Sequence, residues 1–436
     1  MISRLFLPMN TFFPNRHQTF IRHLHQHFGL VVHDGGRWTF ASGDVIDTDK
    51  IQNRLGDITT LQEFKDEWNR YRRYIMETAN TLPGITISSE NDLAGMESTK
   101  RIMADTLRSA LILSEMARET RIDAVVTSTD YTRHARPILY MAAQLGIPTV
   151  HVEHGLFAME PYPPPGQKQQ TMAPFASNYV ILDNPLEVDI YQKRDLQSSV
   201  KQLLPLGTPL DNSTGGTSPN RQQARALLNI SPDEACIALA LSWSEPHGPD
   251  ALFRRQANEV AWVQTVFETI QKSHWKNRIR ILIKVHPAMK DFGQYAYVRN
   301  WYNQLAMNCG VYSQTQIMAE HLPETIAAAD VVMAQSYSSV LWDSILQKTP
   351  TAIALPSLWT AGMGDSVIPD SAVSKAGLLS YIRNESDLLS MIETNCTPGR
   401  QTEFSELTHS FFKTWNIRSE TAAIKSERIV KWLKTL

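Results

Sequence analysis

The sequence predicts an α/β protein with two doubly wound domains, because short apolar runs typical of strands alternate with amphipathic runs typical of helices along most of the chain. Strands separated by helices of this length must be joined by parallel crossovers. A chain of 436 residues is also too long to fold around one ordinary hydrophobic core, and its length suits two such domains with a closing helix. Two domains of this kind imply a cleft between them.

The first half opens with a strand, a helix and a second strand. An apolar run at residues 2–8 is followed by a helical pattern at 16–28 and by another apolar run at 30–33. The apolar residues of this helix recur on one side, so we expect its four histidines, which lie between residues 17 and 27, on a solvated face rather than at a metal site. Later elements of this half are expected at 61–80, 97–119, 124–127, 136–145, 149–153, 179–182 and 185–194.

A change of composition then marks the boundary between the domains. Residues 207–220 are dense in Gly, Pro, Ser, Thr and Asn, which interrupt regular structure, so we expect the linker there. We therefore divide the chain into a first domain at 1–206, the linker, a second domain at 221–402 and C-terminal helices at 403–436. Elements of the second domain are expected at 221–228, 237–241, 258–271, 279–285, 301–307, 323–328, 331–334, 339–347 and 351–354.

The composition is that of an ordinary globular protein, with 42% hydrophobic and 20% charged residues. The formal net charge is −2, and a protein that binds nucleic acid through many phosphates is expected to have a broad basic surface. Nucleic acid is therefore not expected as a partner. The three cysteines share no metal-like spacing with the histidines. No apolar run spans a bilayer and the N-terminus lacks a signal-peptide core, so we expect a cytoplasmic protein. Peripheral membrane contact through the Lys- and Trp-bearing segment 425–436 stays open.

Polar residues follow three predicted strands of the second half. The carboxyl ends of parallel strands meet at one edge of a sheet, and ligands of open α/β sheets bind there. Hydroxyls and free N–H groups at the start of a helix favour an anion. Each residue alone fits a capping or strand-end role, but together they predict a phosphate site. The residues are Ser242, Trp243, Ser244, His286, Pro287, Tyr337, Ser338 and Ser339.

The order of these motifs resembles that of the GT-B transferases typified by CDP-glycerol glycerophosphotransferases and by related capsule and cell-wall polysaccharide transferases. The matching pieces lie between Asp123 and about Pro356 and include His154-Gly155, the Gly207 motif, His286-Pro287 and Ser338-Ser339. The His-Pro and Ser-Ser motifs also resemble those of bacterial sialyltransferases and Kdo transferases, whose donors carry CMP.

The resemblance implies the GT-B fold, in which two Rossmann-like domains face a central cleft and a last helix crosses back to the first domain. It also implies that His286, Ser338 and Ser339 bind the phosphate and nucleotide of a donor, with Gly207 in the same donor set. His154 would then be the general base on the acceptor side.

The chemistry of group transfer fits this division. One hydroxyl must lose a proton while a departing phosphate is neutralised. Histidine side chains in general titrate in the range that this proton transfer needs, so His154 is the first candidate. Glu153 is the second candidate for the base, and Asp130, which follows the strand at 124–127, is the third. A helix dipole can serve the phosphate, so we expect a nucleotide-activated donor substrate and no obligatory metal ion or cofactor.

Departures from the family pattern bear on the substrate. Leu210 stands where the family has arginine, and Ser336 replaces an aspartate. Because charged side chains are lost, we expect transfer of a sugar from a CMP-, CDP- or UDP-linked donor to a surface polysaccharide, a glycolipid or another glycan. Three alternatives stay open: transfer of a polyol phosphate, a UDP-N-acetylhexosamine 2-epimerase-like activity suggested by the pattern from His151 to Leu156, and a scaffold without catalysis. The oligomeric state is also left open.

Overall fold

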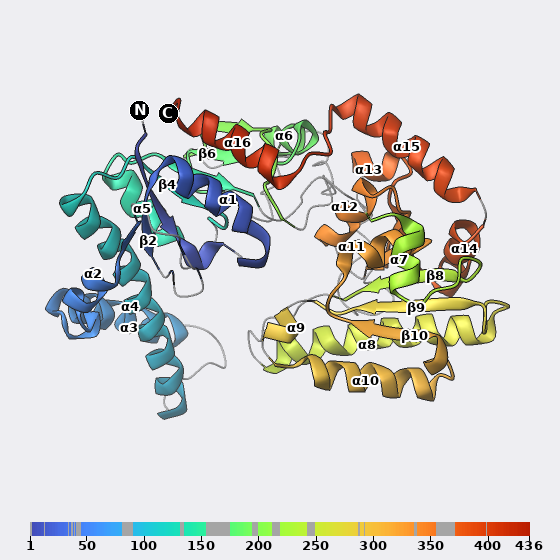
Figure 1. The fold of residues 1–436 in the computed structure, drawn as a ribbon. Helices are drawn as coiled ribbons and strands as arrows, with labels where there is room; N and C mark the ends of the chain where they lie inside the picture. The colour runs from blue at the N-terminus through green and yellow to red at the C-terminus, as the bar shows by residue number, and fades with distance from the viewer. Residues whose placement is uncertain are drawn as a thin grey trace.

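The computed structural model describes most of the chain as two domains, each built on one parallel β-sheet (Figure 1). The first sheet has seven strands and the second has six. The described residues are 2–12, 14–33, 35, 38, 40, 45–80, 90–130, 135–153, 175–193, 199–211, 219–241, 249–286, 288–291, 293–334, 338–354, 371–397 and 399–436.

The first sheet has the order β3-β2-β1-β4-β5-β6-β7, and every neighbouring pair is parallel. The order changes direction between β1 and β4, which is the topological switch point where such sheets bind ligands. The strands are β1 (Arg4–Pro8), β2 (Gly29–His33), β3 (Val45–Asp47), β4 (Ala124–Thr127), β5 (Thr149–Val152), β6 (Tyr179–Ile181) and β7 (Gln202–Leu204). The helices are α1 (Pro14–His27), α2 (Asp49–Leu55), α3 (Gln62–Asn80), α4 (Glu90–Glu119), α5 (Ala135–Gln144) and α6 (Pro185–Gln192), with 3₁₀ turns at Met9–Thr11 and Ile58–Thr60.

The second sheet has the order β10-β9-β8-β11-β12-β13 and is also parallel throughout. This is the strand order of a Rossmann fold, with the switch point between β8 and β11. The strands are β8 (Ala235–Ala240), β9 (Ile279–Lys284), β10 (Thr315–Met318), β11 (Val331–Ala334), β12 (Thr351–Ala354) and β13 (Ser380–Ile382). The helices are α7 (Arg221–Leu227), α8 (Pro249–Lys272), α9 (Ala288–Asp291), α10 (Tyr295–Asn308), α11 (Leu322–Ala328), α12 (Ser339–Leu346), α13 (Ala372–Lys375), α14 (Glu385–Asn395), α15 (Arg400–Trp415) and α16 (Ala422–Leu433), with a 3₁₀ turn at Tyr312–Gln314.

Helices cover both faces of the first sheet, as alternate residues of β1 show. Leu5 and Leu7 share one apolar cluster with residues of α1 and α16, whereas Phe6 belongs to a second cluster with residues of α4 and α5. Successive strand residues point to opposite faces, so the two clusters lie on opposite sides of the sheet. Figure 1 shows α16 beside α1, with the two chain ends close together. The last helix therefore completes the core of the first domain.

Helix α6 connects the two domains by its packing. It follows β6 of the first sheet, but Leu186 and Ile190 are fully buried in an apolar cluster of the second domain. That cluster contains Trp342 of α12 and Phe411 of α15. Because burial of large apolar side chains is the main stabilising contribution to a protein interface, the domains are held together at α6.

The prediction of two Rossmann-like α/β domains is confirmed. Four strands were not expected from the sequence, namely β3, β7, β10 and β13, and these are the edge strands of the two sheets. The expectation that the histidines of α1 lie on a solvated face is wrong for His17, which is fully buried. His17 precedes Phe20 and Ile21 by three and four residues and therefore lies on the apolar side of the helix.

Candidate functional site

The carboxyl edge of the second sheet gathers the predicted donor-site residues that the structure describes. Ala240 of β8 pairs with Lys284 of β9 on one side and with Ala334 of β11 on the other, so these three strands end level with one another. His286 lies two residues beyond β9 and is exposed. Ser338 comes four residues after β11, at the switch point. The carboxyl ends of β9, β8 and β11 therefore form one edge, and His286 follows one of them.

Ser338 begins helix α12. Its hydroxyl accepts a hydrogen bond from the N–H of Val340 at 3.4 Å, and its carbonyl accepts one from the N–H of Leu341 at 3.0 Å. Ser338 and Ser339 are both half-buried. Ser338 is thus an N-cap, and the start of the helix directs its positive dipole end toward the edge. The two properties are compatible with an anion site.

Lys284 is a polar residue of this edge that the sequence did not single out. It is buried, and its ammonium donates to the carbonyl oxygens of Val285 at 2.9 Å and Ala319 at 2.8 Å. Burial lowers the pKa of Lys284 to about 8, opposed by the nearby charge of Glu320. Lys284 ties the segments after β9 and β10 together, next to His286. The signal in the sequence was a lysine at the end of this strand, directly after the apolar run at residues 281–283 and two residues before His286.

The carboxyl edge of the first sheet carries a fully buried acid–histidine–acid cluster, made of Asp130, His151 and Glu153. The Nε2 atom of His151 is 2.9 Å from an oxygen of Glu153. Its Nδ1 atom is 3.9 Å from Oδ1 of Asp130, and neither of these two atoms has a hydrogen-bond partner among the residues that the structure describes. Burial alone opposes charging of His151, but the Asp130 charge and the Glu153 hydrogen bond outweigh it and raise the pKa of His151.

Asp130 also anchors the chain on the far side of the cluster. Its Oδ2 atom accepts the backbone N–H groups of Ala176 at 2.8 Å and Ser177 at 3.0 Å. The ring of Phe175 lies 5.2 Å from that of His151. The cluster therefore connects the ends of β4 and β5 to the segment that leads into β6, and Asp130 and Glu153 both face His151.

The switch point of the first sheet holds a second buried histidine. His17 at the start of α1 lies with its Nε2 atom 3.1 Å from the hydroxyl of Ser128, which follows β4. The backbone N–H of Ser128 donates to the hydroxyl of Thr11 at 3.3 Å, and Thr11 follows β1. Three polar side chains thus link β1, β4 and α1 at the point where the strand order reverses.

Gly207 lies beside the closing helix. Its φ is +92°, and a Cβ placed there would come within 2.7 Å of Cγ of Lys425 on α16. The ammonium of Lys425 is buried and contacts Asp183 at 2.6 Å. The N–H of Thr208 donates to the same carboxylate at 3.0 Å. The structure thus gives Gly207 a packing contact with the helix that returns to the first domain.

Two further buried acids lie between the domains near this ion pair. Burial raises the pKa of Asp343 on α12 to about 7, while Arg16 opposes the shift and Asp183 adds to it. Burial also raises the pKa of Glu187 on α6 well above its usual value. Asp343 comes five residues after Ser338 on the chain, so the donor-edge helix also carries a buried acid of the domain joint.

Six predicted site residues lie outside the described residues, so their placement is not given. Among the residues that are described, no group of three or more His, Cys, Asp or Glu side chains is arranged to hold a metal ion. Within the same part of the chain, no helix is both long and apolar enough to cross a membrane. The six residues are His154, Ser242, Trp243, Ser244, Pro287 and Tyr337.

No family model matches the sequence, and no curated protein sequence matches it at a significant level. Solved structures do match. A complex of S. aureus MnaA with UDP aligns with a TM-score of 0.52 at 13% identity, covering 100% of this chain and 96% of that one. An α,α-trehalose-phosphate synthase (UDP-forming) from Burkholderia vietnamiensis aligns with a TM-score of 0.50 at 11% identity, covering 100% of both chains. The wall teichoic acid polymerase TagF aligns more loosely, with a TM-score of 0.46 at 10% identity over 99% of this chain and 88% of that one.

The alignments to MnaA and to the synthase extend over the whole of this chain and establish its fold. Together with the two parallel sheets and the returning helix α16, they show that the chain has the GT-B fold. The predicted fold class is therefore confirmed. Its structural neighbours are enzymes of this fold.

Proposed function

We propose that the protein is a glycosyltransferase that moves a sugar from a nucleotide-activated donor to a surface-polysaccharide, glycolipid or other glycan acceptor. The observation that carries the proposal is the edge formed by β9, β8 and β11. Exposed His286 follows β9 and Ser338 at the start of α12 follows β11, and these two strands flank β8. An imidazole and a helix N-terminus at a switch point suit the phosphates of a nucleotide.

At the donor edge the reaction requires stabilisation of negative charge. The bond between sugar and phosphate breaks with its electrons going to the phosphate. We assign His286, Ser338 and Ser339 to that phosphate, and Lys284 to holding the segment that carries His286. The sequence adds Ser242, Trp243, Ser244, Pro287 and Tyr337 to this set, with Gly207 as a more distant member.

At the acceptor edge the reaction requires a base. We propose that His154 takes the proton of the acceptor hydroxyl while that oxygen attacks the sugar carbon. Glu153 and Asp130 are the second and third candidates. Their buried contacts with His151 support a positioning role, in which they hold the end of β5 directly before His154.

The donor assignment is tested by calorimetry with CMP, CDP, UDP and GDP. We expect one of these nucleotides to bind wild-type protein, and His286→Ala to weaken that affinity at least about tenfold because a charge-assisted contact is lost. His274→Ala removes an exposed histidine elsewhere in the second domain and serves as the matched control. Unchanged affinity in His286→Ala would contradict the donor site. UDP is included because the MnaA complex and the trehalose-phosphate synthase reported above are both named for it.

Turnover distinguishes the remaining candidates. His154→Ala is expected to keep nucleotide affinity and to lose transfer, and retained transfer would move the base to Glu153 or Asp130. Use of CDP-glycerol in place of a nucleotide sugar would favour polyol-phosphate transfer. If no nucleotide raises the melting temperature, the scaffold alternative is favoured.

The epimerase alternative has one observation in its favour. Asp130, His151 and Glu153 place two carboxylates and an imidazole at a strand-end edge, and proton abstraction from a sugar carbon uses groups of these types. Incubation with UDP-N-acetylhexosamine alone tests it. An epimer formed without any acceptor would support the epimerase and contradict the transferase.

A further inference from the structure

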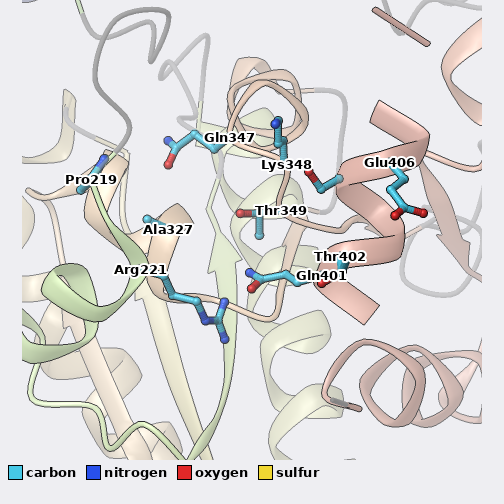
Figure 2. A pocket seen from close by; sticks show the side chains of 10 residues that line it. Pro219, Arg221, Ala327, Gln347, Lys348, Thr349, Gln401, Thr402 and Glu406 are labelled. Atoms are coloured by element: carbon cyan, nitrogen blue, oxygen red, sulfur yellow. The ribbon is translucent and has the colours of Figure 1, made fainter. Parts of the chain in front are cut away.

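A pocket of about 390 Å³ lies in the second domain, away from the donor edge (Figure 2). Thr349 in its wall comes two residues before the first residue of β12, so the pocket is at the amino edge of the sheet, whereas His286 and Ser338 lie at the carboxyl edge. Its volume falls in the range of small-molecule sites, roughly 300–1,000 Å³. The lining comes from the start of α7, the end of α11, the segment after α12 and the start of α15.

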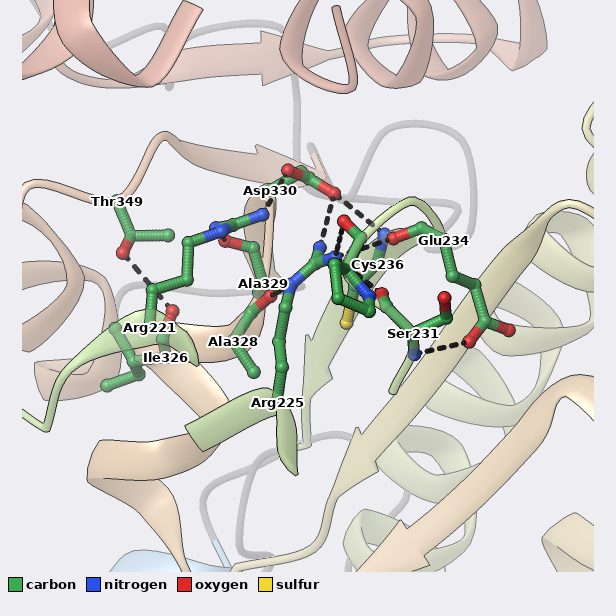
Figure 3. Close-up of polar contacts among 11 residues, drawn as sticks. Arg221, Arg225, Ser231, Glu234, Cys236, Ile326, Ala328, Ala329, Asp330 and Thr349 are labelled. Carbon is green, nitrogen blue, oxygen red and sulfur yellow. Dashed lines mark hydrogen bonds and ion pairs between the residues drawn. The ribbon is translucent and has the colours of Figure 1, made fainter. Parts of the chain in front are cut away.

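One wall of the pocket is held in place by ion pairs (Figure 3). Arg221 donates to the carbonyl of Ala329 at 2.7 Å and pairs with Asp330. Arg225 pairs with the other oxygen of Asp330 at 3.2 Å. Two guanidinium groups share one carboxylate, so this wall keeps one positive charge. The contacts with Ala329 and Asp330 hold Arg221 in place where it lines the pocket. A guanidinium has five N–H donors, and these contacts use only some of them.

Gln347, which follows α12, carries a buried side-chain amide. Both polar atoms of its amide are buried, and within the described ranges of the chain neither has a hydrogen-bond partner. An amide without partners carries a free-energy cost that native proteins avoid. Because the amide offers both donors and an acceptor, its natural partner is a hydroxyl group, which can donate and accept at once.

The opposite wall adds groups of the same kind. Gln401, Thr402 and Ser405 at the start of α15 bring one amide and two hydroxyls. In Figure 2 the side chains of Arg221 and Gln401 point toward each other across the pocket. Exposed Lys348 adds a positive charge and forms no ion pair with any residue that the structure describes, while Glu406 adds a negative charge. The surroundings therefore keep one net positive charge among many hydroxyl and amide groups.

We propose that this pocket binds a sugar unit that carries one anionic group, either a carboxylate or a phosphate. Arg221 and Lys348 pair with the anionic group, because charge-assisted hydrogen bonds are the strongest available there. The amides of Gln347 and Gln401 and the carboxylate of Glu406 bind the hydroxyls. The site is separate from the proposed donor and acceptor sites and does not depend on catalysis.

Calorimetry with glucuronate and with glucose 6-phosphate tests the proposal, with glucose and inorganic phosphate as the partial probes. We expect at least one acidic sugar to bind about tenfold more tightly than either partial probe. Lys348→Gln and Gln401→Leu should each weaken that binding about tenfold, because each removes a direct partner. Lys276→Gln changes an exposed lysine of the same domain outside the pocket and should leave the affinity unchanged.

Four results would contradict the proposal. The first is no heat of binding with either acidic sugar at up to about 10 mM, which is weaker than specific sites of this size. The second is equal affinity in the wild type and in both pocket variants. The third is loss of binding in His286→Ala, since that would place the probe at the donor edge. Binding of inorganic phosphate as tight as that of glucose 6-phosphate would also contradict the role given to the hydroxyls. Nucleotide affinity is measured on the same variants, so failure here is separable from failure of the donor site.

Discussion

The two sheets both end in polar residues at their carboxyl edges, but the residues are held differently. At the first sheet Asp130, His151 and Glu153 are fully buried and contact one another or backbone N–H groups. At the second sheet His286 is exposed and Ser338 is half-buried. Moving a buried charge away from its partner is costly, whereas moving an exposed side chain exposes no buried charge. We infer that the first edge is a rigid support and that the second provides the groups that meet a soluble nucleotide.

The largest expected effect comes from removing the central residue of the rigid edge. His151→Leu removes the imidazole that lies between two buried carboxylates, so the free energy of unfolding should fall by about 3–5 kcal/mol. Urea denaturation at pH 7 measures it. His286→Leu at the exposed edge is the matched comparison and should change stability by less than about 0.5 kcal/mol. Equal losses in the two variants would remove the distinction between the edges.

The joint between the domains should give a pH dependence. Asp343 has a pKa of about 7 in the folded protein, above its ordinary value of 3.8, because it is buried. The folded state therefore holds a proton that the unfolded state has lost between these two values. The stability that Asp343 contributes is present below pH 3.8 and falls by up to about 1.4 kcal/mol per pH unit until about pH 7.

Asp343→Asn should remove this slope, because asparagine does not titrate. The difference between variant and wild type, measured by urea denaturation from pH 4.5 to 8, should move in favour of the variant as the pH rises. Asp189→Asn, at a surface pair with Lys193, is the control and should give a difference that barely changes with pH. A constant difference for Asp343→Asn would show that the acid is already ionised in the folded state.

Gly207 separates a structural from a donor-binding interpretation. Gly207→Ala places a Cβ 2.7 Å from Lys425 at a φ of +92°, so we expect a stability loss of about 2 kcal/mol. Gly146→Ala has a similar φ of +68° with open space around it, and should lose about 1 kcal/mol from backbone strain alone. Nucleotide affinity should be unchanged in both. A loss of affinity restricted to Gly207→Ala would instead return this residue to the donor set.

The sequence predicted the interior of the fold better than its margins. Central strands such as β4 and β11 are apolar runs, and both were predicted with the bounds that the structure has. The four missed strands lie at sheet edges, where one side of a strand has no neighbour and polar residues are tolerated, as in Gln202–Leu204. Their sequences therefore lack the apolar pattern on which strand prediction depends.

The same limit applies to the candidate site. Strand ends located His286, Ser338, Glu153 and Asp130, because parallel topology alone decides which ends share an edge. The pairing of Glu153 with His151 could not be deduced, since it depends on rotamers and on the return of the chain at Phe175. The spacing of residue 17 from Phe20 already indicated burial of that histidine, although the histidine-rich stretch around it suggested solvent.

The smallest expected change in stability concerns Ser338, where capping and phosphate binding coincide. Ser338→Ala removes the hydroxyl that accepts from Val340, so stability should fall by about 1 kcal/mol. Ser371→Ala removes a comparable cap at α13, where the hydroxyl accepts from Ser374 at 3.1 Å, and should cost a similar amount. The two variants should differ in nucleotide affinity, because only Ser338 lies at the switch point of the second sheet. We expect an affinity loss of about tenfold for Ser338→Ala and none for Ser371→Ala. Equal affinities would reduce Ser338 to a cap and leave His286 as the described side chain that carries the donor site.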